Sequence, residues 1–476
     1  MKLQPYPAYK DSDVPWLGNV PTHWEVTQAK RYYEIQLGKM LQNSPSGSGD
    51  DPVSYLKAQH VQWFRVRTDN LPTMWASRTE IGKYGVQVGD LLVCEGGEGG
   101  RSALIKDFIG RIIIQNALHR VRSSRSSTNE FLQYVMYTIS TTEWFDAINN
   151  KATISHFTKD KFGSLNIPFP PLPEQHAIAR FLDHIDGRVN RYIRAKRKLI
   201  ALLNEQKQAI IHRAVTRGLD PDVPLRPSGV AWSGNVPAHW EVRRIKYLLR
   251  EVDVRSTTGE ETLLSLRMIQ GLVPHDEHFA RPGQAPTLIG YKVVHPGQIV
   301  LNRLQANNGL VFASEIHGVV SPDYAVFDAI GDVDLHYLTA LFRTPLMKHK
   351  FRIESKGLGT GTAGFLRLYT DRFGMIPVAL PPKGEQTRIM QGLEAELTEL
   401  NAAISRVERE IDLIREYRTR LIADVVTGKL DVGRQESAWA AAAALPEELE
   451  EIEPEADKEG DLDAEPVEWE EEANVP

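Results

Sequence analysis

The sequence contains one cysteine, Cys94, in 476 residues, which excludes an intramolecular disulfide and any zinc site built from several cysteines. No stretch approaches the roughly 18 uncharged apolar residues needed to cross a bilayer. The opening segment, MKLQPYPAYKDSDVPW, lacks the apolar core of a signal peptide. We therefore expect a cytoplasmic chain without a membrane anchor.

Apolar residues make up 42% of the chain and charged residues 25%, as in ordinary globular proteins. The length exceeds what one compact core usually supports, so two domains with connecting elements are expected.

The net charge of −6 is unevenly distributed. Residues 446–476 hold 15 Asp and Glu against one Lys, so the rest of the chain is mildly basic. This balance permits binding to a polyanion without requiring it. The acidic, apolar-poor end cannot form a core, and we expect a disordered tail over 433–476 that aids solubility or mimics the charge of DNA.

A long internal repeat determines the expected architecture. WLGNVPTHWEV at 16–26 returns as WSGNVPAHWEV at 232–242, with nine identities in eleven positions. DKFGSLNIPFPPLPEQ (160–175) matches DRFGMIPVALPPKGEQ (371–386), and AVTRGLD (214–220) matches VVTGKLD (425–431). The segments between these markers agree poorly. The marker segments, which we call the frame, are therefore duplicated, whereas the sequences between them are not.

Each Pro-rich joint leads into a stretch without proline, 174–216 and 385–427, whose apolar residues recur in steps of three and four. This spacing predicts two amphipathic helices with a coiled-coil stripe, interrupted by Arg418 in the second. Their net charges, +5 and −3, favour pairing with each other. The residues expected at the helix-pair interface are Ile178, Leu182, Ile185, Val189, Leu199, Leu203, Ile210, Leu393, Leu397, Leu400, Ile404, Val407, Ile411, Ile414, Leu421 and Val425.

The joints are too short for a long return connection, which favours antiparallel helices. Short apolar runs at 90–94, 111–115, 298–302 and 318–321 predict strands, whereas 131–139 and 335–342 have helical spacing. The predicted fold class is α+β: two similar mixed α/β domains separated by two long antiparallel coiled-coil helices, with pseudo-two-fold symmetry. The expected segments are a globular domain at 1–173, a helix at 174–220, a second domain at 221–384, a second helix at 385–432 and the tail at 433–476.

Candidate catalytic motifs are weak. GGEGGR at 96–101 lacks the Lys-Ser/Thr pair of a phosphate loop and is better explained as a turn. Asp323, Glu354 and Lys356 loosely imitate a Mg²⁺-dependent nuclease motif at an unusually long spacing. His23 and His239 recur in the duplicated motif without a nucleophile partner, which indicates packing or capping. We predict no catalytic and no metal site.

Binding to DNA is easier to support, because Arg and Lys read guanine and hold phosphates, and Asn and Gln read adenine. The candidates lie in the divergent middles of the two halves. They are Lys57, Gln59, His60, Arg65, Arg67, Gln115, Asn116 and His156 in the first half, and Arg267, Gln270, Arg303, Gln305, Asn307, Asn308, Lys356 and Arg367 in the second.

Taken together, the duplicated WxGNVPxHWEV, PPLPEQ with PPKGEQ, VSPDYAVF at 320, GTGTAGFLRLYTDRFGMIP at 359 and the VT..LD helix ends resemble the specificity subunit of type I restriction-modification enzymes. The resemblance spans about residues 1–432. It implies that each globular domain is a target recognition domain for half of a split DNA site. It also implies that the helix pair fixes the spacing and docks two methyltransferase subunits, alongside restriction subunits.

The same resemblance implies a chain that is not itself an enzyme. S-adenosylmethionine, ATP and Mg would be bound by the partner subunits, and none by this chain. Because the two middles differ in sequence, we expect an asymmetric bipartite DNA site. Two alternatives stay open: a two-headed scaffold that binds proteins, and a Mg-dependent nuclease.

Overall fold

The computed structural model describes residues 3–96, 98–142, 157–230, 233–268, 270–275, 287–358 and 365–433. The described residues of 1–189 and 415–476 form one compact unit, and those of 190–414 form a second. Each long helix therefore contributes to both units. The predicted acidic tail, apart from Gly433, lies outside the described residues.

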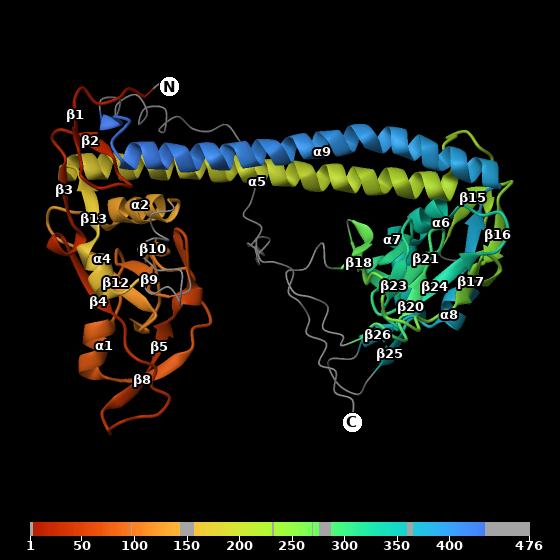
Figure 1. Cartoon of the computed structure of the whole chain (residues 1–476), viewed down its shortest axis with the longest axis horizontal. Helices are drawn as coiled ribbons and strands as arrows, with labels where there is room; N and C mark the ends of the chain where they lie inside the picture. The colour runs from red at the N-terminus through yellow and green to blue at the C-terminus, as the bar shows by residue number, and fades with distance from the viewer. Residues whose placement is uncertain are drawn as a thin grey trace. The chain divides into compact units, whose positions relative to one another are not determined.

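The first unit contains a mixed α/β body and the adjoining ends of both long helices (Figure 1). Its elements are β1 (Tyr9–Asp11), β2 (Asn19–Pro21), β3 (Glu25–Gln28), η1 (Ala29–Arg31), β4 (Tyr33–Leu37), β5 (Asp50–Leu56), η2 (Ala58–His60), β6 (Val61–Gln62), β7 (Arg65–Val66), β8 (Thr73–Ser77), α1 (Arg78–Tyr84), β9 (Leu91–Cys94), β10 (Ser102–Leu104), β11 (Ile112–Ile114), β12 (Leu118–Ser123), α2 (Asn129–Ser140), α4 (Lys159–Ser164), β13 (Asn166–Phe169) and the start of α5 (Leu172–Arg217).

The second unit repeats this plan. Its elements are β14 (Leu225–Pro227), β15 (Asn235–Pro237), β16 (Glu241–Arg244), η3 (Ile245–Tyr247), β17 (Leu249–Val252), β18 (Leu264–Arg267), β19 (Gly271–Pro274), β20 (Lys292–Val294), β21 (Ile299–Asn302), η4 (Ala306–Asn308), β22 (Val311–Ala313), β23 (Gly318–Val320), β24 (Tyr324–Ala329), α6 (Leu335–Phe342), α7 (Pro345–Glu354), β25 (Lys356–Leu358), β26 (Phe365–Arg367), α8 (Thr370–Met375), β27 (Pro377–Leu380) and α9 (Lys383–Val426).

The duplication extends into the middles, where the sequences hardly agree. The first unit has an antiparallel sheet in the order β10-β9-β12-β4, and the second has β22-β21-β24-β17, which is the same order of equivalent strands. Each sheet packs against one helix, α2 or α6, that follows β12 or β24 in the chain. The strands predicted at 90–94, 111–115, 298–302 and 318–321 and the two predicted helices are confirmed as β9, β11, β21, β23, α2 and α6.

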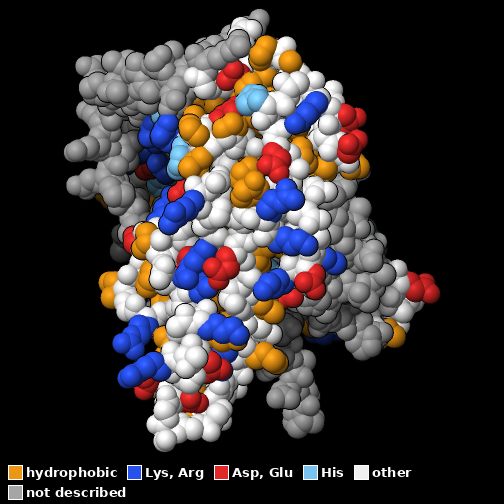
Figure 2. Space-filling model, turned by 90° about the vertical axis from the view of Figure 1, so that its left-hand side faces the viewer, with side chains coloured by type: hydrophobic (Ala, Val, Ile, Leu, Met, Phe, Trp, Pro, Cys, Tyr) orange, Lys and Arg blue, Asp and Glu red, His pale blue; other side chains and the backbone are white. Residues whose placement is uncertain are grey.

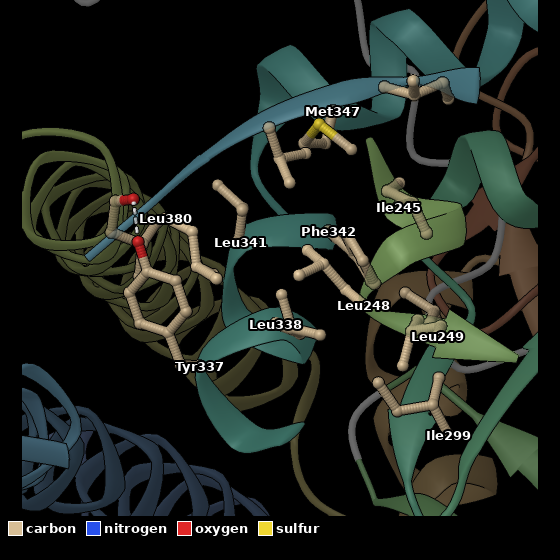
Figure 3. Close-up of a cluster of buried hydrophobic side chains, with 14 of the residues drawn as sticks. Ile245, Leu248, Leu249, Ile299, Tyr337, Leu338, Leu341, Phe342, Met347 and Leu380 are labelled. Atoms are coloured by element: carbon tan, nitrogen blue, oxygen red, sulfur yellow. Dashed lines mark hydrogen bonds between the residues drawn. The ribbon is translucent and has the colours of Figure 1, made fainter. Parts of the chain in front are cut away.

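Buried apolar side chains join each sheet to the long helices. In the second unit, Leu338 and Phe342 of α6 meet Leu249 and Ile299 of the sheet (Figure 3). Tyr337, fully buried on the other side of α6, donates its hydroxyl to the backbone oxygen of Val215 in α5 at 2.8 Å. The core of this unit therefore includes the helix surface as one of its walls.

The two long helices lie side by side and antiparallel within each unit (Figure 1). In the second unit, Lys196 of α5 pairs with Glu410 of α9 at 2.8 Å, and Lys207 donates to Asn401 at 2.8 Å. Residue numbers thus rise along α5 while those of the contacting residues on α9 fall, so the two helices are antiparallel. The predicted pairing, its direction and its use of opposite charges are confirmed.

A largely buried carboxylate joins the duplicated tryptophan motif to the start of a long helix. In the first unit, Trp24 Nε1 donates to Glu174 Oε1 at 3.1 Å and His23 Nε2 lies 3.0 Å from Oε2. In the second unit, Trp240 and His239 contact Glu385 in the same way, at 3.1 and 2.7 Å. We call each arrangement an anchor. Both histidines, for which packing or capping was predicted, are about half exposed and contact the carboxylate at the start of a long helix.

Each anchor also receives the end of the opposite long helix. Gly428, with φ +77°, follows α9, and a Cβ there would overlap the Pro21 ring and lie 3.1 Å from Trp24. Gly218, with φ +81°, follows α5 beside Trp240. Glycine suits both helix ends because it adopts the left-handed conformation, and at Gly428 the missing Cβ also leaves room for Pro21 and Trp24.

The buried stripe on α5 differs from the predicted one in its middle. Leu199 was expected at the interface, but its side chain is exposed, and the next residue, Ile200, is half-buried in its place. Two turns earlier, Ile193 is buried while Tyr192 is exposed. One row of the stripe, through Val189 and Leu203, is therefore as predicted, and the other row is displaced by one residue. Both rows keep the spacing of a coiled coil, so the periodicity did not distinguish between them.

The remaining predicted interface residues lie in the helix pair, buried or half-buried. Most deeply buried are Ile178, Leu182, Val189, Leu393, Val407, Ile411, Leu421 and Val425, and half-buried are Ile185, Leu203, Ile210, Leu397, Leu400, Ile404 and Ile414. The α+β fold class, with two similar mixed domains and two long antiparallel helices, is confirmed. Within the described residues, no helix is both long and apolar enough to span a membrane.

We expect Gly428→Ala to destabilise the first unit by about 3 kcal/mol, through a strained backbone and overlap with Pro21. Gly89→Ala is the matched control, because Gly89 has φ +89° and nothing within 4 Å of its Cβ position. It should cost only about 1 kcal/mol. Urea unfolding measures both, and equal losses would show that the anchor imposes no steric demand.

Candidate nucleic-acid interface

The first-half candidates gather at one end of the β5/β11 pair. Lys57, Gln59 and His60 directly follow β5, and the Arg67 N–H donates to the His60 oxygen at 2.8 Å. The Gln115 N–H donates to the Leu56 oxygen at 2.9 Å, which brings the β11–β12 turn to the same place. The structure therefore brings seven of the eight candidates together. The eighth, His156, lies outside the described residues.

These seven differ in what they offer to a ligand. Gln59 and Arg65 are exposed, whereas Lys57, Arg67, Gln115 and Asn116 are half-buried. His60 is buried, and its Nδ1 accepts from the Lys57 N–H at 3.1 Å. Burial, aided by the charge of Lys57, lowers the pKa of His60, so the ring is neutral at pH 7. It supports the loop instead of supplying a positive charge.

In the second half, three cations lie near one another. Lys356 of β25 is directly opposite Arg367 of β26, and the Leu368 N–H donates to the Arg303 oxygen at 2.9 Å. Gln305, Asn307 and Asn308 follow Arg303 at and within η4. Arg267 and Gln270 lie elsewhere, at the turn between β18 and β19.

Two of these cations are engaged in the fold. Arg303 pairs with Glu251 and donates to Thr370 Oγ1 at 3.1 Å, and Arg367 pairs with Asp323 at 2.9 Å. Burial alone would raise the pKa of Glu251, but the Thr370 hydrogen bond and the Arg303 charge outweigh it and lower the pKa. The exposed candidates in this half are Gln270, Gln305, Asn308 and Lys356.

The weak catalytic motifs find structural roles. Asp323 is occupied by Arg367, and Glu354 by Lys350 at 2.5 Å. The GGEGGR segment, whose Gly97 lies outside the described residues, connects the antiparallel strands β9 and β10. Across the described ranges, no group of three His, Cys, Asp or Glu could hold a metal ion.

Surface charge is mixed on the face of the molecule shown in Figure 2. Lys and Arg side chains are spread over it with Asp and Glu between them. The described part of this face therefore carries no continuous basic patch.

The long helices carry an exposed apolar face that was not among the predicted sites. On α5, Tyr192, Leu199 and Leu202 are 43%, 39% and 53% exposed, and their spacing places them on one side of the helix. On α9, Leu413 and Tyr417 are 64% and 56% exposed, one turn apart. The signal was present in the sequence as apolar residues additional to those needed for one inter-helix stripe.

The chain is similar to known proteins in sequence and in fold. Residues 62–201 match the family model for the type I restriction modification DNA specificity domain. A solved chain from work on complex assembly and conformational transition of the type I R-M system has the same fold, with a TM-score of 0.59 at 13% identity, over 86% of this chain and 99% of that chain.

Two curated relatives come from Methanocaldococcus jannaschii. The type I restriction enzyme MjaVIII specificity subunit is 24% identical over 246 residues, which cover 50% of this chain and about half (51%) of that protein. The putative type I restriction enzyme MjaX specificity subunit is 21% identical over 453 residues, 87% of this chain and 96% of that protein. The chain resembles type I restriction specificity subunits in a domain, in overall sequence and in fold.

We expect Arg303→Met to lower the free energy of unfolding of the second unit by about 2 kcal/mol, because Glu251 loses a charged partner. The stabilising effect of Glu251 exists above its unfolded pKa of about 4.3 and disappears as pH falls through its lower folded pKa. The variant should therefore lose less stability on acidification.

Lys356→Met is the control, because Lys356 is exposed, and it should change stability by less than about 0.5 kcal/mol. Urea titrations at pH 7 and pH 4 measure both variants. Equal stability of Arg303→Met and wild type would contradict a structural role for Arg303.

Proposed function

We propose that this chain is the DNA sequence-specificity subunit of a type I restriction-modification complex. Each globular domain would read one half of an asymmetric bipartite site in double-stranded DNA. The observation that carries the proposal is the duplicated frame with unlike exposed polar residues: Gln59 and Arg65 in one half, Gln305, Asn308 and Lys356 in the other. Equal frames with different reading residues are suited to two different half-sites.

The proposal assigns no reaction to this chain. The carboxylates of the nuclease-like motif are neutralised by basic partners, as described above. Methyl transfer with S-adenosylmethionine, and cleavage with ATP and Mg²⁺, would belong to modification and restriction subunits. The cytoplasm, where such a complex meets DNA, is the proposed location.

The exposed apolar face of the helix pair supports docking of methyltransferase subunits. Leu202 on α5 and Leu413 on α9 occupy equivalent positions of the repeat, and both are more than half exposed. Exposed leucines at equivalent positions suit two copies of the same partner.

The central experiment measures affinity for DNA by fluorescence anisotropy, with the full chain alone and with its methyltransferase partners. The assembled complex should prefer its selected bipartite duplex over random duplexes by at least about a thousandfold. The chain alone should bind more weakly. A complex without any sequence preference would favour the protein-binding scaffold instead.

Docking is tested by Leu202→Glu combined with Leu413→Glu. The two charges should prevent burial of these positions and reduce methyltransferase binding by about a hundredfold, measured as stoichiometry and affinity in size-exclusion and titration experiments. Ile109→Glu is the control, because Ile109 is an apolar residue that is 99% exposed on the first globular domain. Unimpaired assembly of the double variant would locate the docking surface elsewhere.

A further inference from the structure

The turn of the β6–β7 hairpin has an unusual backbone. Gln62 pairs with Arg65, so Trp63 and Phe64 form a two-residue turn. Phe64 has φ +63°, in the left-handed region that favours glycine. An aromatic residue adopts this conformation only where its ring makes compensating contacts. The hairpin also carries Arg65 and follows Gln59, both exposed candidates for contact with DNA.

The Phe64 ring fits into a cluster of aromatic rings on α2. Its centroid lies 5.2 Å from that of Tyr134 and 5.2 Å from that of Tyr137, and the Trp63 ring lies 5.3 Å from Tyr137. The guanidinium of Arg418, on α9, lies 5.2 Å from the Phe64 centroid and 5.4 Å from that of Tyr137. These distances suit cation–π contacts.

Arg418 is itself held in place by α5. Its Nε and Nη2 donate to the two carboxylate oxygens of Asp186 at 2.8 and 2.9 Å. A bidentate pair fixes the plane of the guanidinium, and both side chains are largely buried. Phe64, Tyr137, Asp186 and Arg418 thus form a continuous connection from the hairpin to both long helices, which we call the clamp.

The described part of the second unit contains no such clamp. The two units can be compared residue by residue through one equivalent hydrogen bond. Gln175 accepts from the Thr128 N–H, and Gln386 accepts from the Asp334 N–H, so positions on α2 correspond to positions on α6, and positions on α5 to positions on α9.

In this alignment Tyr137 corresponds to Arg343, Asp186 to Leu397 and Arg418 to Lys207. All three equivalents line an open groove of about 1370 Å³ between α6 and the helix pair. The charges and rings that build the clamp in the first unit are thus replaced by other residue types in the second.

We propose that Arg418 is a positioning residue for DNA reading by the first domain. Through Phe64 it fixes the hairpin that carries Arg65 against the helix pair, so that the reading side chains keep a defined orientation. It acts through the hairpin and touches no base. The inference rests on the proposed function and adds an asymmetry: one reading domain is fixed to the helices by a charged clamp, and the other is not.

The experiment uses the full chain assembled with its methyltransferase subunits, and duplexes with single-base substitutions in each half-site. The first variant is Phe64→Gly, which removes the ring and relieves the backbone. The second is the double variant Asp186→Leu with Arg418→Met, which replaces the ion pair by apolar side chains and leaves no unpaired charge. Each should reduce base discrimination by about five- to tenfold at one half-site and leave the other within about twofold.

Lys207→Met is the matched control, because Lys207 occupies the position of Arg418 in the second unit without a clamp, and it should change neither half-site. Unchanged discrimination in both clamp variants, or equal loss at both half-sites, overturns the inference while the proposed function stands. Absence of sequence preference in the wild-type complex would instead overturn the proposed function. Thermal unfolding of Phe64→Gly checks that the first unit remains folded.

Discussion

A largely buried carboxylate needs hydrogen-bond donors, and this requirement organises both halves of the molecule. Glu174 and Glu385 lie at the starts of the two long helices, and each is satisfied by a tryptophan N–H and a histidine ring from the duplicated motif. The tryptophan also covers the end of the opposite helix. The start of one helix, the end of the other and the edge of a globular domain are therefore joined at one point.

The anchors make the helix pair part of each domain's core. Because the domain and helix share buried side chains, such as Tyr337 against Val215, a domain cannot rotate on the helix without exposing apolar surface. The candidate reading residues lie on turns and hairpins of the sheets. A rigid frame with variable turns allows such residues to change without changes in the anchors.

The sequence was sufficient for the large features because they are periodic or repeated. Proline-free stretches with apolar spacing predicted the two helices, and their opposite charges predicted that they pair. The prediction that Leu199 lies at the helix-pair interface was wrong. Leu199 and Ile200 both fit a row of apolar residues, and only packing against α9 selects one of them. The partners of Glu174 lie about 150 residues away along the chain, so local patterns could not reveal them.

Site residues were harder to predict, because side-chain type does not show which partner a side chain will meet. Arg303 and Lys356 look alike in the sequence, yet one neutralises Glu251 and the other is exposed. Arg418 was noticed as an interruption of the apolar stripe. The structural role of Arg418 depends on Asp186 and Phe64, which are far from it in the sequence and contact it only in the folded chain.

The division of the chain between the two units has a consequence for synthesis. The second unit is continuous, from residue 190 to 414, whereas the first needs the C-terminal part of α9, and Gln4 pairs with Asp431. During translation the second unit can fold as soon as it emerges. The apolar cluster of the first unit also contains Leu421, Ile422 and Val425, so it stays incomplete until α9 has been made, and the half synthesised first is the half completed last.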